Sequence, residues 1–315
     1  MTTINSVLGP LDTVDLGFTL MHEHMIVSSA GISQNYAELL GAGFMERIVN
    51  GLIKAREGGV NTIVDATTID LGRDVNLMAE VSRRSGVNII AITGWWLDIP
   101  RMLTGVSADR LAQLFIREIR EGIAGTGIKA AVLKSASDIS GVTAGDESVL
   151  RAVARAHLET KVPIMLHSYA PGQVGRQQLA VLRDEGVDLR RVKVDHSNDT
   201  TDVEYLTWLL EQGCYLGLDR YPGNNVSPLA RTKTMKALID AGYENRLLPS
   251  HDWSFVWIVA EASPMPRQAE REKRNPYGYL YLKKEVFSQL RQMGVAEATL
   301  TRLCVDNPRQ FFEGP

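Results

Sequence analysis

The chain has 315 residues, of which 44% are hydrophobic and 23% are charged, so it is long enough to bury a large core. Its formal net charge is -3 and its pI is about 6.1, and it has no basic block, which argues against nucleic acid as a partner. No apolar run is long enough to span a bilayer, and the N-terminus lacks the charged and apolar regions of a secretory signal.

Short β-branched runs alternate along the chain with amphipathic segments that have helical spacing. The predicted strands are 18–24, 61–68, 88–94, 129–134, 163–168, 192–197, 215–219 and 247–252. The predicted helices are 36–57, 73–85, 107–123, 146–160, 173–185, 199–212, 231–241 and 280–293, with a long loop after residue 252 and a C-terminal segment over 297–312. Eight such pairs predict an α/β fold, a single (β/α)8 or TIM barrel over residues 1–315, whose active site lies at the C-terminal ends of the strands.

Histidines gather at the predicted strand ends. His22 and His24 are two residues apart in FTLMHEH, so in a strand they face the same side. Such a pair can bind a metal ion or form hydrogen bonds, and the motif alone leaves the two readings even. His167 and His196 end the fifth and sixth strands, and four histidines at one rim favour the metal. His157 lies on a predicted helix, where we expect an exposed position.

The eighth strand ends in His251 and Asp252, and only one of two adjacent residues can face into the barrel. We expect Asp252 to face inward, because a carboxylate can bind a metal ion and later accept a proton. His251 is then expected to face the helices as a structural residue.

Lys134, at the end of the fourth predicted strand, has two interpretations. Its stem can extend along the barrel mouth with the ammonium group in water. Alternatively, its neutral amine can react with CO2 to give a carbamate, an anion able to bridge two metal ions. Spacing alone favours the first interpretation.

This set of residues resembles the phosphotriesterase family of the amidohydrolase superfamily, which includes the phosphotriesterase-like lactonases. The resemblance covers nearly the whole chain and rests on MHEH (21–24), GIKAAVLK (127–134), PIMLHS (163–168), VDHSNDTTD (194–202), YLGLDRY (215–221), SHDW (250–253) and VDNPRQFF (305–312). It implies a binuclear metal centre, usually of zinc, whose ions share a bridging hydroxide. The implied ligands are His22, His24 and Asp252 for one ion, His167 and His196 for the other, and carboxylated Lys134 for both.

For the reaction, the resemblance implies that hydroxide attacks the substrate while Asp252 accepts the proton. In the phosphotriester-hydrolysing members the proton passes on through a histidine on the seventh strand and an aspartate after the sixth. Asp199 matches that aspartate, but Arg220 stands in the histidine position. Because arginine stays protonated, it can hold Asp252 or a substrate oxygen electrostatically but cannot relay a proton. The LDRY sequence resembles the lactonase-like branch of the family.

The rim loops combine features of both branches. GWWLDIP places Trp96 where the phosphotriester-hydrolysing members have an aromatic wall, whereas the stretch after the seventh strand is shorter than theirs. Trp96, Tyr221, Phe255 and Trp257 could line an apolar pocket for an acyl chain or an aryl leaving group. For Phe255, packing of a loop against the rim is an equal alternative.

The sequence therefore predicts a metal-dependent hydrolase of small lactones or activated esters, with phosphotriesterase side activity. The alternatives are a dedicated phosphotriesterase (aryldialkylphosphatase), a mononuclear amidohydrolase that does not use Lys134, and a non-catalytic binding protein on the same barrel. Zinc is expected, although nitrogen and oxygen ligands also accept cobalt, manganese or iron. The two cysteines, Cys214 and Cys304, lie outside any CxxC motif, so we expect buried thiols and a cytoplasmic location. The family resemblance implies a homodimer.

Overall fold

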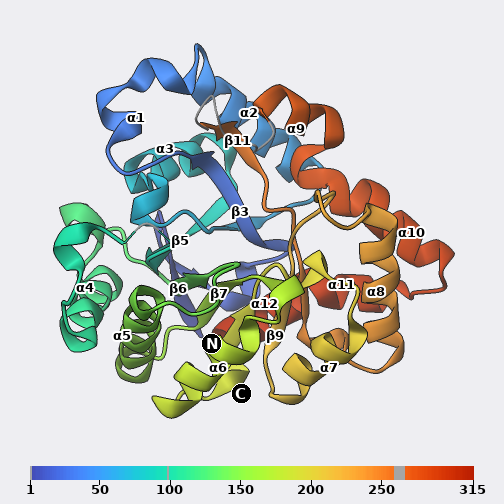
Figure 1. Cartoon of the computed structure of the whole chain (residues 1–315). Coiled ribbons are helices and arrows are strands. Elements are labelled where there is room, and N and C mark those ends of the chain that lie inside the picture. The colour runs from blue at the N-terminus through green and yellow to red at the C-terminus, as the bar shows by residue number, and fades with distance from the viewer. Residues whose placement is uncertain (1, 98, 259–266) are drawn as a thin grey trace.

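A curled sheet of parallel strands lies at the centre of the computed structural model, and helices surround it (Figure 1). The structure describes residues 2–97, 99–258 and 267–315. Within these residues the sheet has nine strands, in the order β10-β9-β8-β7-β6-β5-β4-β3-β11. This is the predicted (β/α)8 barrel, in which β10 and β11 together take the place of the eighth strand.

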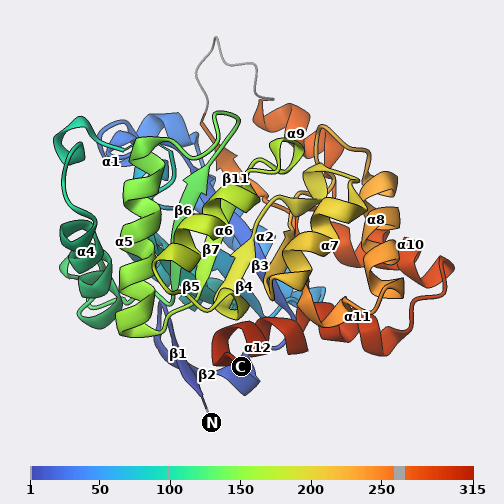
Figure 2. The ribbon, with the colours of Figure 1, turned by 60° about the horizontal axis from the view of Figure 1, so that its bottom comes forward.

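The sheet is made of β3 (Thr19–Val27), β4 (Thr62–Asp65), β5 (Asn88–Gly94), β6 (Val132–Ser137), β7 (Ile164–Ser168), β8 (Val192–Val194), β9 (Tyr215–Leu218), β10 (Leu247–Pro249) and β11 (Ser254–Trp257). The helices are α1 (Ile32–Asn35), α2 (Phe44–Glu57), α3 (Val75–Ser85), α4 (Ala108–Arg120), α5 (Ala144–Thr160), α6 (Gly175–Asp184), α7 (Val203–Glu211), α8 (Pro228–Asp240), α9 (Gln268–Arg274), α10 (Phe287–Gln292), α11 (Glu297–Cys304) and α12 (Asp306–Glu313). An antiparallel hairpin of β1 (Thr3–Ser6) and β2 (Gly9–Asp12) precedes the barrel. In Figure 2 the hairpin and α12 lie at the end of the barrel opposite to α1 and α9.

The barrel closes between its first and last strands. The Asp252 amide donates a hydrogen bond to the His22 carbonyl oxygen at 3.1 Å, and the His24 amide donates to the Trp253 carbonyl oxygen at 2.8 Å. The last strand is kinked at Asp252, whose φ of 53° is left-handed. The chain then resumes as β11, with Ser254 opposite His24 of β3. The kink therefore places the Asp252 side chain beside the two histidines.

Glu23 fastens this closure from the outer side of β3. Its carboxylate accepts hydrogen bonds from the backbone amides of His251 and Trp253, each at 3.0 Å, and from the Ser250 hydroxyl at 2.7 Å. His251 Nδ1 lies 2.6 Å from the same carboxylate, and His251 Nε2 accepts from the Leu282 amide at 3.1 Å. His251 thus faces the helix layer, as its position next to Asp252 predicts.

Three segments differ from the sequence-based prediction. The helix predicted over 36–57 begins only at Phe44, because Gly41 and Gly43 have φ values of 77° and 67° that a helix excludes. Part of the predicted loop after residue 252 forms β11 and α9, while residues 259–266 of that loop lie outside the described residues. The fourth strand runs over 132–137 rather than 129–134, because β7 pairs with it as far as Ser137. Lys134 therefore lies within the strand, not at its end.

The two cysteines and His157 are all buried. Cys214 and Cys304 are free and buried, as expected. His157, by contrast, is not exposed as predicted: only 4% of its surface is accessible, and its Nδ1 donates to the Val162 carbonyl oxygen at 2.7 Å in the αL turn that ends α5. Within the described residues, no helix has the length and apolarity needed to cross a bilayer.

The buried position of His157 predicts a pH dependence of stability. Burial lowers the pKa of His157 below its usual 6.5, so the native state favours the neutral ring. Its contribution is complete above about pH 6.5 and is lost as the pH falls below that value, by at most about 1.4 kcal/mol per pH unit. His157→Gln keeps a donor for the Val162 carbonyl but does not titrate. Urea unfolding at pH 7.0 and pH 5.5 should show a smaller loss of stability in the variant, and an equal loss in both proteins would contradict this assignment.

Candidate metal centre

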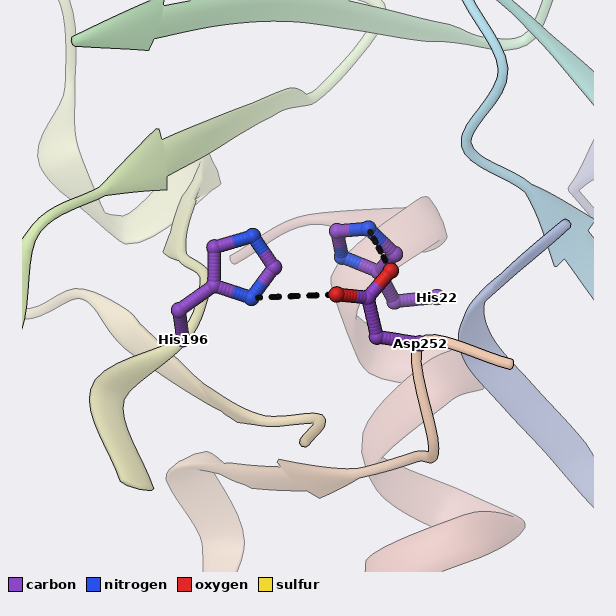
Figure 3. A group of neighbouring side chains, drawn as sticks. All are labelled: His22, His196 and Asp252. Carbon is purple, nitrogen blue, oxygen red and sulfur yellow. Dashed lines mark ion pairs between the residues drawn. The ribbon is translucent and has the colours of Figure 1, made fainter. Parts of the chain in front are cut away.

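Nitrogen and oxygen atoms from the first and eighth strands converge at the C-terminal rim. Asp252 Oδ1 lies 3.2 Å from His24 Nε2 and 3.6 Å from His22 Nε2. On its other side, Nδ1 of His24 lies 2.8 Å from Thr67 Oγ1. Figure 3 shows the Asp252 carboxylate between His22 and His196, with Oδ2 4.0 Å from His196 Nδ1. Three of these side chains, His22, His196 and Asp252, are close enough to share one ion.

The fifth and sixth strands contribute a second pair of donors. His167 Nδ1 lies 2.8 Å from His196 Nε2, and the Trp96 indole N–H donates to the same His167 nitrogen at 3.2 Å. His196 Nδ1 faces Asp219 Oδ1 at 2.9 Å, so this hydrogen-bond network assigns the His196 proton to Nδ1. In neutral rings both facing nitrogens then carry lone pairs. Two lone pairs at this distance repel each other, and a cation between them would remove the repulsion.

A buried pair of carboxylates orients these histidines from below. Asp195 and Asp219 are fully buried, and His22 Nδ1 lies 3.1 Å from the first and 3.2 Å from the second. Asp219 also holds His196 Nδ1, so Nε2 of His22 faces Asp252 and Nε2 of His196 faces His167. A metal-binding histidine usually has its other nitrogen held by a carboxylate in this way. Gly217 makes room for the pair, because a Cβ at 217 would lie 2.4 Å from Asp219 Oδ2 and 2.7 Å from Asp195 Oδ1.

Lys134 lies at the same depth as these carboxylates. Its Nζ is 2.8 Å from Asp195 Oδ2, and only 2% of the residue surface is accessible. Lys193 Nζ lies 2.7 Å from the other Asp195 oxygen and 3.7 Å from Asp219. Asp195 thus has two cationic partners, and it would keep one of them if the Lys134 amine became neutral or carboxylated. The lysine position is tightly packed, since a Cβ on Gly94 would lie 1.9 Å from the Lys134 carbonyl oxygen.

The charge states of His167, His196 and Asp252 suit a metal ion. His22 differs, because burial and Lys134 lower its pKa but Asp195 and Asp219 raise it above 6.5. Burial, followed by the charge of Arg220, holds the pKa of His196 well below 6.5, and burial also lowers the pKa of His167. Both rings are therefore neutral near pH 7, as ligand histidines must be. Burial alone would raise the pKa of Asp252, but the hydrogen bond to His24 and nearby positive charges hold it well below its usual value, so Asp252 is an anion.

Backbone strain coincides with this group. His196 and Asp252 have left-handed φ values of 59° and 53°, a conformation that residues with a side chain adopt rarely. Such strain gathers at binding and catalytic sites, where the surrounding structure maintains it. Both strained positions are candidate ligands.

Arg220 links two of the predicted catalytic residues. Its Nε donates to Asp252 Oδ2 at 3.1 Å, and its Nη1 donates to Asp199 Oδ2 at 2.5 Å. Asp199 is held on its other oxygen by Arg231 Nη2 at 2.7 Å. These contacts leave Arg220 fixed over the rim beside a cavity of about 230 Å³ that Asp199, Arg220 and Asp252 help to line.

The four predicted substrate-pocket residues lie in different places. Tyr221 and Trp257 line the cavity beside Asp252. Trp96 does not line it and instead contacts His167. Phe255 neither lines this cavity nor contacts His167. Its ring packs edge-on against Tyr279, with centroids 4.9 Å apart, and it lines a separate cavity between α2 and α9. Its position agrees with the packing alternative considered for it.

Sequence reasoning missed Lys193, Asp195 and Asp219, which are buried beneath the ligands, and Asp138, which lies beside His167. A period-two signal was present in VKVDHS, where Val192 and Val194 face one side of β8 and Lys193 and Asp195 the other. Two charged residues on one face of a buried strand indicate a paired polar cluster inside the barrel.

A parallel barrel whose strand ends bring together histidines and an anionic aspartate is the arrangement used by hydrolases that bind metal. A sequence profile of the phosphotriesterase family matches residues 2–312, and the chain belongs to this hydrolase family. It is 39% identical to a phosphotriesterase homology protein of Mycobacterium tuberculosis over 329 residues, with 99% of this chain and 98% of the relative covered.

Two further relatives have names that state an activity. An aryldialkylphosphatase of Saccharolobus solfataricus is 36% identical over 308 residues, with 96% of each chain covered. An N-acetyltaurine hydrolase of Tetraodon nigroviridis is 24% identical over 351 residues, covering 98% of this chain and 97% of the relative. The family resemblance stated from the sequence is therefore confirmed.

The carboxylate beneath the ligands yields a prediction about metal affinity. Asp219→Asn removes the charge that holds two histidine rings, so metal affinity should fall by about 10- to 100-fold. Asp138→Asn is the matched control, because Asp138 Oδ2 lies 3.6 Å from a single ring, that of His167, and its side chain is 41% exposed. Competition with a chelator measures both affinities, and an equal loss in the two variants would show that Asp219 has no special role.

Proposed function

We propose that the protein is a hydrolase with two divalent metal ions, zinc by expectation, that acts on lactones or activated esters and on phosphotriesters as a side activity. Its ligands would be His22, His24 and Asp252 for one ion, His167 and His196 for the other, and carboxylated Lys134 for both. When bound, the ions would supply an activated water and polarise the C=O or P=O bond of the substrate. We also propose a homodimer, from the family resemblance, and a cytoplasmic location, from the two free cysteines.

The placement of Arg220 is the observation that carries this proposal. Asp252 would accept the proton from the attacking water, and its Oδ2 is held by Arg220 at 3.1 Å. Because Arg220 does not give up its proton near neutral pH, no proton passes from Asp252 to Asp199 through it. The proton stays at Asp252, where it can be returned to the leaving oxygen.

The leaving group decides which substrate gains from this arrangement. The alkoxide released from a lactone is strongly basic and must be protonated as the ring opens, which Asp252 can do. A nitrophenolate released from an activated phosphotriester is weakly basic and leaves without a proton. Retention of the proton therefore favours lactones over phosphotriesters with an aryl leaving group.

A dedicated phosphotriesterase is the second candidate. The contact of Trp96 with His167 supports it, because an aromatic wall suits an aryl leaving group, as does the relative named aryldialkylphosphatase. The name N-acetyltaurine hydrolase points instead to attack on an acyl carbon in another relative. A non-catalytic binding protein finds less support, since all six expected ligand positions are filled and the family is hydrolytic.

Substrate preference tests the proposal directly. Protein loaded with zinc, cobalt or manganese should hydrolyse acyl-homoserine lactones or δ-lactones with a kcat/KM at least about tenfold above that for paraoxon, a difference of about 1.4 kcal/mol in barrier. Metal content should be measured on the same samples. Faster turnover of paraoxon would establish the dedicated phosphotriesterase, and two bound ions without any turnover would support the binding protein.

The role of Lys134 can be tested separately. Lys134→Ala removes the shared ligand, so kcat/KM should fall by about 100-fold or more and the metal content should drop below two ions per chain. A short carboxylic acid such as propionate should restore part of the activity by taking the place of the carbamate. Lys129→Ala, five residues earlier, is the control and should change neither quantity. Nearly full activity in Lys134→Ala would indicate a mononuclear centre.

A further inference from the structure

The cavity beside Asp252 has two chemically different sides. The side formed by the sixth, seventh and eighth strand ends contains Asp199, Arg220 and Asp252. A second group of lining residues comes from β11, from α9 and from the chain beyond Tyr221, and it contains Asn224, Trp257, Arg271 and Arg274. Figure 1 shows α9 beside β11 on this side of the barrel. The cavity thus extends from the candidate metal centre to a second group of arginines.

The charges on the first side are already matched. Asp199 lies between Arg220 and Arg231, which approach its two oxygens at 2.5 Å and 2.7 Å. Asp252 is shared by Arg220 and the ring of His24. Both carboxylates therefore already have cationic partners within 4 Å.

Arg271 lacks a carboxylate partner among the described residues. Its Nη2 makes a long contact, 3.3 Å, with the backbone carbonyl oxygen of Asp252, and its guanidinium lies 4.2 Å from the ring centroid of Trp257 and 5.2 Å from that of Trp253. Its Nε is buried without an acceptor in the described part of the chain, and so is the indole nitrogen of Trp257. Two buried donors on one wall without acceptors indicate a missing acceptor group.

Arg274 adds a second positive charge to the same wall. It follows Arg271 by three residues in α9, so both side chains project from one face of the helix. Its Nη1 donates to Asn224 Oδ1 at 2.6 Å, which ties α9 to the loop after β9. The described residues offer Arg274 no carboxylate within 4 Å, so both guanidinium charges remain available to the cavity.

We propose that Arg271 and Arg274 bind a carboxylate carried by the substrate, separate from the bond that is broken. The inference rests on the proposed function, because it takes Asp252 as the reacting end of the cavity. A guanidinium group matches a carboxylate with two parallel hydrogen bonds, and such a contact is strong where water is partly excluded. Half-esters of dicarboxylic acids and lactones that bear an acidic side chain have the required form.

A matched pair of substrates tests this subsite. Mono-4-nitrophenyl adipate carries a free carboxylate, and 4-nitrophenyl methyl adipate has the same length without the charge. The metal-loaded protein should have a higher kcat/KM for the free acid. Arg271→Gln and Arg274→Gln should each reduce that preference by about tenfold, mainly through KM, the size expected for a lost hydrogen bond to a charged group. Lys273→Gln removes the same charge from α9 outside the cavity and should leave the preference unchanged.

The outcomes separate this inference from the proposed function. Equal turnover of the two esters, or equal loss of both in the arginine variants, would overturn the carboxylate subsite while leaving the hydrolase intact. If neither ester is hydrolysed, calorimetric titration with adipate still decides the question. Binding of adipate that Arg274→Gln weakens would support the subsite. Absence of adipate binding, or equally tight binding of inorganic phosphate, would overturn a subsite specific for a substrate carboxylate.

Discussion

The two buried carboxylates of Asp195 and Asp219 are the constraint on which the rest of the site depends. An anion inside a barrel is stable only when cations and N–H donors surround it, because the interior screens charge poorly. The barrel supplies Lys193 from β8, Lys134 from β6 and imidazole nitrogens from the histidines above. The contacts of Asp195 and Asp219 with Nδ1 of His22 and of His196 leave Nε2 of each ring facing away from the carboxylates. The arrangement of the candidate ligands at the rim is thus a consequence of charge balance one layer below it.

The sequence predicted the barrel because its strands are continuous apolar runs, and it predicted the rim because histidines and an aspartate end those runs. It did not predict the cluster below, since Lys193 and Asp195 were read as part of a buried strand rather than as its inward face. The boundaries that moved have local causes: two glycines with positive φ delay α2. No local pattern announced β11, because its pairing with β3 depends on the left-handed turn at Asp252. Tertiary contacts of this kind leave no periodic signal in one chain.

Two arginines flank Asp252 and differ in their surroundings. Arg220 is held between two carboxylates, so its charge serves to position them. Arg271 contacts the rings of Trp253 and Trp257 and a backbone carbonyl oxygen. These contacts orient its guanidinium group but do not neutralise its charge. Family membership shows that the protein is a hydrolase. In the proposed function, substrate choice depends on the segments after β9 and β11 that carry these arginines, since the segments beyond the strand ends of a barrel commonly set its specificity.

The closure of the barrel has a consequence for how the molecule opens. The ligands of one proposed ion come from β3 and from the kink that follows β10, which are joined by the backbone hydrogen bonds between strands one and eight and by the Glu23 carboxylate. An ion held there would be bound by residues from both the first and the last strand, and so would link the two edges of the sheet. Local unfolding that parts these two strands would have to release the ion first. The amide hydrogens at this closure, where β11 pairs with β3, would then exchange slowly when metal is bound and faster when it is removed.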